Sequence, residues 1–342
     1  MYYLDREYNY TPFSSNTFNQ YFGGLRLGIL DIETTGLNPN YTQFILGGLL
    51  TETGNGQRLE QFFADNPSEE KQVLEAYLTA LAPLDIVVTY NGKHFDLPFI
   101  KRRAAELDIP LPKVVPFNLD LYLILNGHSD LRKILPNLKQ KTVENFMGLW
   151  TERNDEISGA QSVELYNQYV RMPSPDLRDV IMLHNSDDVL QLYRLLPILA
   201  KTDFHKAMFT LGFTTKNATQ TDLFDDRPSL QICTIDLKGN QLRITGSQRS
   251  NPQNYLAYQT EKIPYTLILD QNTAAFEAIL PVHKKSGYSF IDLKPLGDVF
   301  STLSKYPTCE NDYLIIKENN EINYMELNHF IQLFFQKVLE VI

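Results

Sequence analysis

Cysteine and tryptophan are scarce in this chain of 342 residues, which contains only Cys233, Cys309 and a single tryptophan. Two cysteines do not build the disulfide framework of a small secreted protein. They also do not form a zinc cluster, and neither lies in a pattern that indicates a nucleophilic thiol. The cysteine content therefore favours a reducing compartment, and the cytoplasm is the location that we expect.

Long hydrophobic runs are also missing. Apolar stretches such as residues 44–50 are far too short to span a bilayer. The first seven residues (Met-Tyr-Tyr-Leu-Asp-Arg-Glu) lack the basic start and the apolar stretch of a secretory signal peptide. We therefore expect a soluble protein that has no membrane partner.

An excess of basic charge is absent as well, since 41 acidic residues stand against 31 lysines and arginines and give a net charge of −10. This balance argues against a broad basic surface that coats duplex nucleic acid, although a protein that holds only a strand end needs no such surface. The most suggestive basic group is Lys101-Arg102-Arg103. We favour a solvated helix face for it over a phosphate contact, because consecutive residues on a helix cannot all face one ligand.

The chain is long enough for two domains, and a hydrophobic content of 43% is ample for ordinary cores. Its character changes after Leu196, where helical periodicity gives way to short alternating runs. We therefore predict a first domain at residues 1–200 and a β-rich accessory domain with a closing C-terminal helix at residues 201–342.

Acidic residues follow two apolar runs in the first half of the chain. Residues 26–30 predict a buried strand, and Asp31 and Glu33 continue it. Side chains two residues apart on a strand point to the same face, so these carboxylates lie side by side. A second buried strand is predicted at residues 85–90, and Asp96 begins the helix after the next loop. As a single residue, Asp96 fits a helix cap equally well.

A third acidic group lies on a helix predicted from about residue 176 to 196. His184 and Asp188 are four residues apart on it and therefore share a face, whereas Asp187 points elsewhere and is expected to be solvated. By itself the pair fits a surface hydrogen bond equally well. The two earlier motifs, in order along the chain, are what favour a shared site.

Together these segments supply four carboxylates and one imidazole. Carboxylates gathered in one place repel one another unless cations lie between them, so the set predicts a divalent-metal site. Metal ions held in this way act on phosphate esters.

The three segments resemble those of the DEDD, or DnaQ-like, 3′–5′ exonucleases, and they are most similar to the YprB-type branch with its ribonuclease-H-like fold. The similarity covers roughly residues 15–200. It rests on Asp-Ile-Glu-Thr-Thr-Gly-Leu at 31–37, Tyr-Asn-Gly-x-x-Phe-Asp at 90–96 and His-Asn-x-x-Asp at 184–188. The four acids of the family correspond to Asp31, Glu33, Asp96 and Asp188. His184 corresponds to the upstream general base, at a spacing of four where most histidine-type members have five.

The resemblance implies a metal-dependent exonuclease that hydrolyses phosphodiester bonds at single-stranded DNA or RNA ends. Two Mg²⁺ or Mn²⁺ ions, about 3.5–4 Å apart, would be bridged by Asp31. Glu33 and Asp188 would complete the coordination of one ion, and Asp96 would bind metal directly or through water. His184, with a free-solution pKa of about 6.5, would take the proton from the attacking water.

The same resemblance implies that Thr34, Thr35 and Leu37 contact the terminal nucleotide through backbone groups and an apolar wedge, and Asn91 joins them as a predicted substrate-binding residue. Thr-Gly is equally an ordinary turn. Two other functions stay open, namely a structure-selective endonuclease on the same fold and a non-catalytic nucleic-acid-binding module. Retention of the four acids and His184 favours an enzyme over the module.

The predicted fold class is α/β, a ribonuclease-H-like mixed sheet flanked by helices, followed by a second β-rich α+β region. Strands are expected at 26–31, 43–51, 58–64, 86–90 and 114–119, and helices at 66–81, 97–107 and 176–196. The second region is expected to contain a hairpin at 230–245, strands at 265–269 and 288–293, and a helix at 326–342.

Two further sets of residues have an ordinary structural role as their favoured interpretation. Asp120, a fifth acid near a strand end, is expected to cap a helix or to support the site rather than to bind metal. The aromatic residues of the second region could stack on bases, but we expect them in its core. They are Tyr255, Tyr258, Tyr265 and Phe290.

Overall fold

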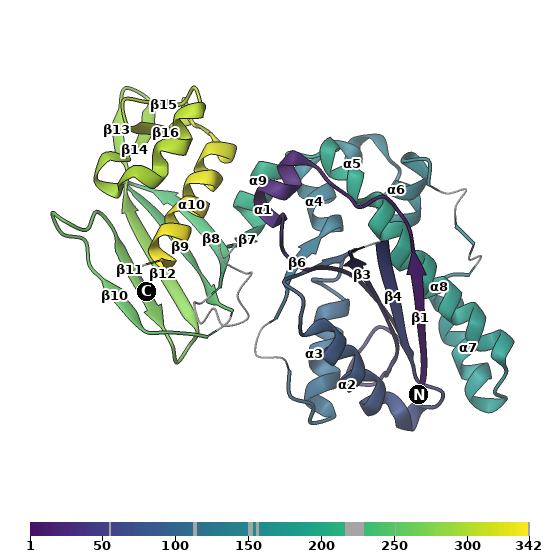
Figure 1. The fold of residues 1–342 in the computed structure, drawn as a ribbon. Helices are drawn as coiled ribbons and strands as arrows, with labels where there is room; N and C mark the ends of the chain where they lie inside the picture. Colours follow the sequence, from purple (N-terminus) through teal and green to yellow (C-terminus); the bar gives the residue numbers. More distant parts are fainter. Residues whose placement is uncertain are drawn as a thin grey trace. The chain divides into compact units, whose positions relative to one another are not determined.

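The computed structural model describes residues 1–54, 56–111, 115–149, 153–154, 157–215, 229–249 and 251–340. The chain divides into two compact units, residues 1–15 with 25–202 and residues 16–24 with 203–342 (Figure 1). That these units correspond to two independent domains stays a prediction. None of the helices in the described ranges combines the length and the hydropathy of a membrane-spanning segment.

A mixed sheet forms the centre of the first unit, with its described strands in the order β1-β4-β3-β2-β5-β6. They are β1 (Tyr2–Tyr8), β2 (Leu27–Thr34), β3 (Phe44–Thr53), β4 (Gly56–Phe63), β5 (Ile86–Thr89) and β6 (Phe117–Asp120). Strand β2 pairs antiparallel with β3 and parallel with β5, so it has a neighbour on each side. Its central place explains why nearly all of its residues are buried.

Helices cover both faces of this sheet, and Figure 1 shows α2 and α3 on one side and α7 and α8 on the other. The α-helices in the described part of the unit are α2 (Glu70–Leu81), α3 (Asp96–Glu106), α4 (Leu121–His128), α5 (Leu131–Ile134), α6 (Gln140–Phe146), α7 (Gly159–Arg171) and α8 (Pro175–Leu195). The predicted fold class, a mixed sheet flanked by helices, is confirmed.

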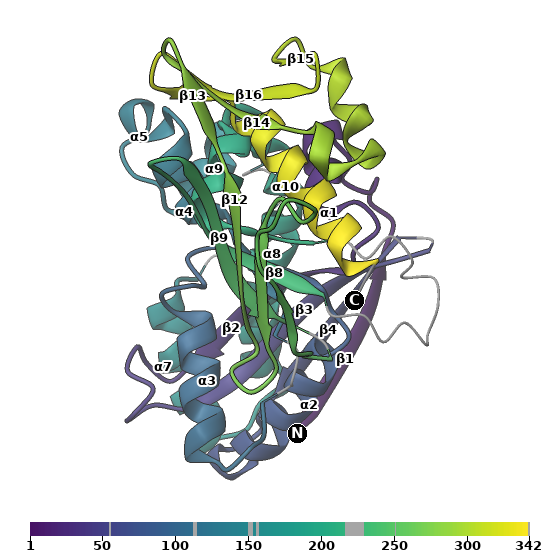
Figure 2. The same cartoon turned by 90° about the vertical axis from the view of Figure 1, so that its left-hand side faces the viewer.

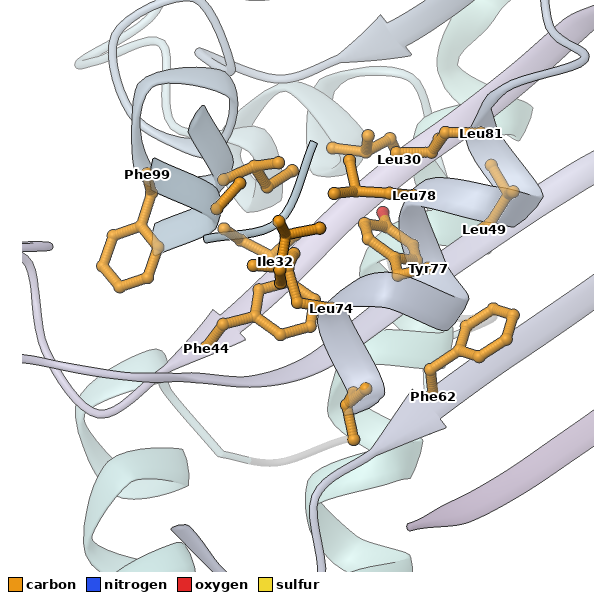
Figure 3. Close-up of a cluster of buried hydrophobic side chains, with 14 of the residues drawn as sticks. Leu30, Ile32, Phe44, Leu49, Phe62, Leu74, Tyr77, Leu78, Leu81 and Phe99 are labelled. Carbon is orange, nitrogen blue, oxygen red and sulfur yellow. The ribbon is translucent and has the colours of Figure 1, made fainter. Parts of the chain in front are cut away.

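Two apolar clusters hold the layers together. Ile32, Phe44 and Tyr77 belong to the cluster between the sheet and the α2/α3 layer (Figure 3). Phe63 and Ile181 belong to the cluster beneath α7 and α8. Truncating a buried aromatic of this kind costs about 3–5 kcal/mol, so these clusters fix the sheet between its helices.

Most predicted elements of the first unit occur within a few residues of their expected ends. The helix expected from residue 66 begins as a 3-10 turn at Pro67–Glu69, capped by Asn66, and continues as α2. The strand expected near 114–119 is β6, and residues 112–114 lie outside the described part. Strand β1 was not predicted, because its exposed face is charged and it pairs only at the sheet edge with β4.

The second unit contains two antiparallel sheets. The strands of the first sheet are β7 (Phe213–Thr214), β8 (Leu230–Lys238), β9 (Gln241–Gln248), β10 (Tyr255–Ala257), β11 (Thr266–Asp270) and β12 (Ala275–Pro281). Those of the second are β13 (His283–Lys285), β14 (Tyr288–Asp292), β15 (Cys309–Glu310), β16 (Tyr313–Glu318) and β17 (Glu321–Ile322). The predicted hairpin is β8 and β9, with Gly239 at φ +58° in its turn.

Three α-helices accompany these sheets in the described part, namely α1 (Asn16–Phe22), α9 (Phe204–Leu211) and α10 (Tyr324–Leu339). Helix α10, in yellow in Figure 2, packs Phe334 against Tyr265 and Phe335 against Phe276. Its apolar face is therefore covered within the unit. The expectation of a core position is wrong for Tyr258, which is 62% exposed.

Candidate metal centre

Strand β2 and helix α8 bring three potential ligands together in the first unit. His184 Nε2 lies 3.7 Å from Glu33 Oε1 and 3.6 Å from Asp188 Oδ2. One ligand atom from each of these residues lies within 4.8 Å of the others. Glu33 and His184 are buried and Asp188 is partly exposed, so a group that could bind a metal ion lies near the carboxyl end of β2.

Asp31 and Asp96 lie beside this group. Burial raises the pKa of Asp31 well above its ordinary value, and the negative charges of Asp188, Asp96 and Glu33 act in the same direction. Burial also raises the pKa of Asp96 to about 7, helped by the charges of Asp120 and Glu33 and opposed by hydrogen bonds from the backbone of Asp96 and Ile32. The four predicted acids therefore repel one another in one place, which is the electrostatic setting of a cation site.

The loop before α3 is built around Asp120. Its two carboxylate oxygens accept hydrogen bonds of 2.9 Å from the backbone amides of Asn91 and Lys93, and it also caps α4. The expected capping and supporting role is confirmed by these contacts. Asn91 adopts φ +68°, a conformation that asparagine tolerates better than most residues. It does not line the cavity described below, so its binding of substrate stays a prediction.

The loop after β2 uses its threonines internally. Thr34 Oγ1 donates to the carbonyl of Gly36 at 2.8 Å, and Thr35 Oγ1 accepts from the amide of Gln43 at 2.8 Å. These contacts fit the ordinary-turn interpretation, and they leave backbone contacts to a substrate untested. Leu37 is 84% exposed at the tip of this braced loop, where an apolar side chain is available to a ligand.

The solvated helix face predicted for residues 101–103 holds for Lys101 and Arg102, which are exposed, and is wrong for Arg103. Arg103 forms two hydrogen bonds with the buried carboxylate of Glu70, at 2.7 and 2.8 Å, and donates to the carbonyl of Pro39 at 3.0 Å. Arg102 pairs with Glu106 one turn away. Arg103 therefore ties the loop after β2 to α2 and α3, while Arg102 stays on a solvated face.

A cavity of about 750 Å³ opens over three of the four acids, and Asp96 does not line it. Asp31, Glu33, His184 and Asp188 line it, as do Thr34, Leu37 and Phe95. Residues 139–141 and 158–160 line it too, which brings Lys139 and Lys141 to the same space. The sequence does not single out these lysines, because they lie apart from the three motifs and an isolated lysine is most simply solvated.

Arg153 reaches Asp188 from the segment before α7. Its guanidinium contacts Asp188 Oδ1 and both carboxylate oxygens of Glu144, and its side chain is 1% exposed. The prediction that Asp187 is solvated is wrong, since Asp187 is buried and accepts a hydrogen bond from the backbone amide of Asn154. The reason is that the described residues 153–154 cover this side of α8.

The sequence of the chain is similar to a known family and to a known protein. A family model described as RNase_H superfamily matches residues 29–200. The uncharacterized protein YprB of Bacillus subtilis (strain 168) is 31% identical over 179 residues, which are 51% of this chain and 42% of that protein. The chain thus spans less than half the length of this relative.

Among solved structures, the family B DNA polymerase from the hyperthermophilic archaeon Pyrobaculum calidifontis aligns with a TM-score of 0.41 and 17% identity. The alignment covers 93% of this chain and 46% of the polymerase. The family assignment rests on the sequence match alone. Because the matched residues 29–200 make up half of the chain and run from β2 through α8, the chain belongs to the RNase H superfamily, whose members are commonly nucleases.

Proposed function

We propose that this protein is a metal-dependent 3′–5′ exonuclease that hydrolyses phosphodiester bonds at single-stranded DNA or RNA ends. The observation that carries the proposal is the meeting of Glu33, His184 and Asp188 within 4.8 Å, with Asp31 and Asp96 beside them. Membership in the RNase H superfamily supports nuclease chemistry at this place.

The donor set fits Mg²⁺ or Mn²⁺. Carboxylate oxygens are the ligands that these hard cations prefer, and the described residues around the cavity provide no thiolate that would favour a softer metal. Asp31, Glu33, Asp96 and Asp188 would hold two ions. When bound, such ions supply Lewis acidity that activates a water and stabilises the departing 3′ oxygen.

His184 would accept the proton of the attacking water, because an imidazole with a free-solution pKa of about 6.5 exchanges protons near neutral pH. Its Nε2 faces both Glu33 and Asp188, which also suits a ligand role. The two roles make different predictions. Replacing a general base slows the reaction and changes its pH dependence, whereas replacing a ligand weakens metal binding.

The cavity suits the end of a single strand better than a duplex. Leu37 and Phe95 would offer apolar contacts to a terminal base. Lys139 and Lys141 would offer cations to the phosphates that follow it, with Lys141 Nζ also held by the carbonyl of Ile157 at 2.9 Å. Because the net charge of −10 is unfavourable for duplex coating, local lysines would provide the attraction.

The test is cleavage of a 5′-labelled single-stranded oligonucleotide by the full chain in Mn²⁺ or Mg²⁺, resolved on a gel. We expect a ladder of single-nucleotide steps that grows from the 3′ end and disappears in EDTA. One discrete internal cut would replace the exonuclease by an endonuclease. No cleavage in either metal would overturn the nuclease proposal in favour of a binding module.

Matched variants assign the activity to the site. Asp188→Asn should abolish cleavage while the chain stays folded by circular dichroism, because the variant keeps the shape of the side chain and removes one charge. Glu75→Gln removes one charge from the exposed side of α2 and should cleave like the wild type. Activity of Asp188→Asn close to that of Glu75→Gln would contradict the assigned site.

A further inference from the structure

Asp31 lies in a row with one residue from each of the next two strands of the sheet. Asp31 on β2 lies opposite Gly48 on β3, and Gly48 lies opposite Gln61 on β4. The middle position has no side chain, and the carboxamide of Asn185 from α8 fills the space. A Cβ on Gly48 would lie 2.2 Å from Asn185 Oδ1, so only glycine admits Asn185 at this place.

Asn185 links the two ends of this row. Its Nδ2 donates to Asp31 Oδ2 at 2.9 Å and to the carbonyl of Asp31 at 3.3 Å. Its Oδ1 accepts from Gln61 Nε2 at 2.9 Å, and the same Nε2 donates to the carbonyl of Met182 at 2.8 Å. Asn185 is fully buried and Gln61 is 1% exposed.

The direction of these hydrogen bonds determines which end of the amide meets Asp31. Because Gln61 presents a donor, the oxygen of Asn185 must turn toward it, and the NH₂ group must turn toward the carboxylate. A donor fixed in this way holds one oxygen of Asp31 and leaves the other available to a cation. It also connects Asp31 to the helix that carries His184 and Asp188.

We propose that Asn185 is a positioning residue for metal binding, oriented by Gln61 and admitted by Gly48. It sets the carboxylate of Asp31 relative to the ligands on α8, so that strand and helix ligands reach the same ions. The inference rests on the proposed function, since it assumes that Asp31 binds metal. Residues that orient metal ligands typically contribute about 10–100-fold to metal affinity.

The test is Mn²⁺ binding to the full chain by isothermal titration calorimetry, without nucleic acid. Asn185→Ala should weaken Mn²⁺ binding about 10–100-fold. Gln191→Ala, which removes another buried amide from α8, is the matched control and should bind Mn²⁺ like the wild type although it also loses stability. Equal Mn²⁺ affinities of the two variants, with the wild type binding normally, would overturn the inference.

A second variant decides the matter if Asn185→Ala does not fold. Gln61→Met keeps the volume of the side chain and removes the donor that orients Asn185, so it should bind Mn²⁺ more weakly than the wild type and than Gln191→Ala. Wild-type affinity in Gln61→Met would contradict the proposed orientation. If the wild-type chain itself binds no Mn²⁺, the proposed function fails and this inference fails with it. If the wild type binds Mn²⁺ and the variants bind it equally well, only this inference fails.

Discussion

Replacing Asp96 by asparagine should stabilise the metal-free chain at pH 8. Asp96 is 5% exposed, and its surroundings raise its pKa from 3.8 to about 7. Between about pH 4 and 7 only the unfolded chain releases this proton, so the folded state loses stability as the pH rises. Above pH 7 the loss is complete, and three pKa units correspond to about 4 kcal/mol. Asparagine is uncharged at every pH and removes this penalty.

Urea denaturation in EDTA at pH 5 and pH 8 measures the effect. Asp96→Asn should exceed the wild type in free energy of unfolding by up to about 4 kcal/mol at pH 8 and by less than about 2 kcal/mol at pH 5. The exposed control Glu75→Gln should stay within about 0.5 kcal/mol at both pH values. Saturating Mn²⁺ should reduce the difference in free energy of unfolding between Asp96→Asn and the wild type at pH 8, because a bound cation stabilises the carboxylate that only the wild type has. This reasoning would be refuted if Asp96→Asn raised the free energy of unfolding equally at both pH values, or lowered it at pH 8.

Three other substitutions test separate parts of the site. His184→Gln should slow cleavage about 10²–10⁴-fold and change the pH–rate curve between pH 5.5 and 8; an unchanged curve with weakened Mn²⁺ binding would make His184 a ligand instead. Arg103→Met should lower the free energy of unfolding by about 3–5 kcal/mol, since it leaves buried Glu70 without its cation; a loss below about 1 kcal/mol in urea would contradict this. Lys139→Ala should raise KM and should lower the slope of log K against log[salt] by about 1, because one phosphate contact is lost. Replacing the exposed Lys133 by alanine should change neither quantity.

The fold of the first unit could be predicted because its strongest signals are local. The apolar run of β2 and the spacing of Val73, Leu74 and Tyr77 on α2 indicate buried elements without knowledge of their neighbours. Strand β1 could not be found in this way, because a charged edge strand is defined by its partner β4. The second compact unit also contains residues 16–24, and no local pattern of the sequence connects these residues with residues 203–342.

The acids of the candidate site were accessible from the sequence because each stands next to a structural signal, such as a strand end or a helix start. The roles of the residues around these acids could not be predicted from the sequence. Asn185 contacts Asp31 only because β2, β3 and β4 pair in one register, and no local pattern encodes that register. Asp187 was assigned to solvent because a helix pattern cannot reveal which neighbouring segment covers it. Roles that depend on tertiary contacts therefore require the structure.

Helix α1 gives the second unit a discontinuous sequence. Tyr21 has no exposed surface, packs edge-on against Phe204 and Phe213, and accepts a hydrogen bond from Asn328. A fragment that ends at residue 202 would thus carry an aromatic helix stripped of its packing partners and prone to aggregation. During synthesis, residues 16–24 must wait for residues 203–328 before they can be buried, so this unit cannot finish folding until Asn328 has been made.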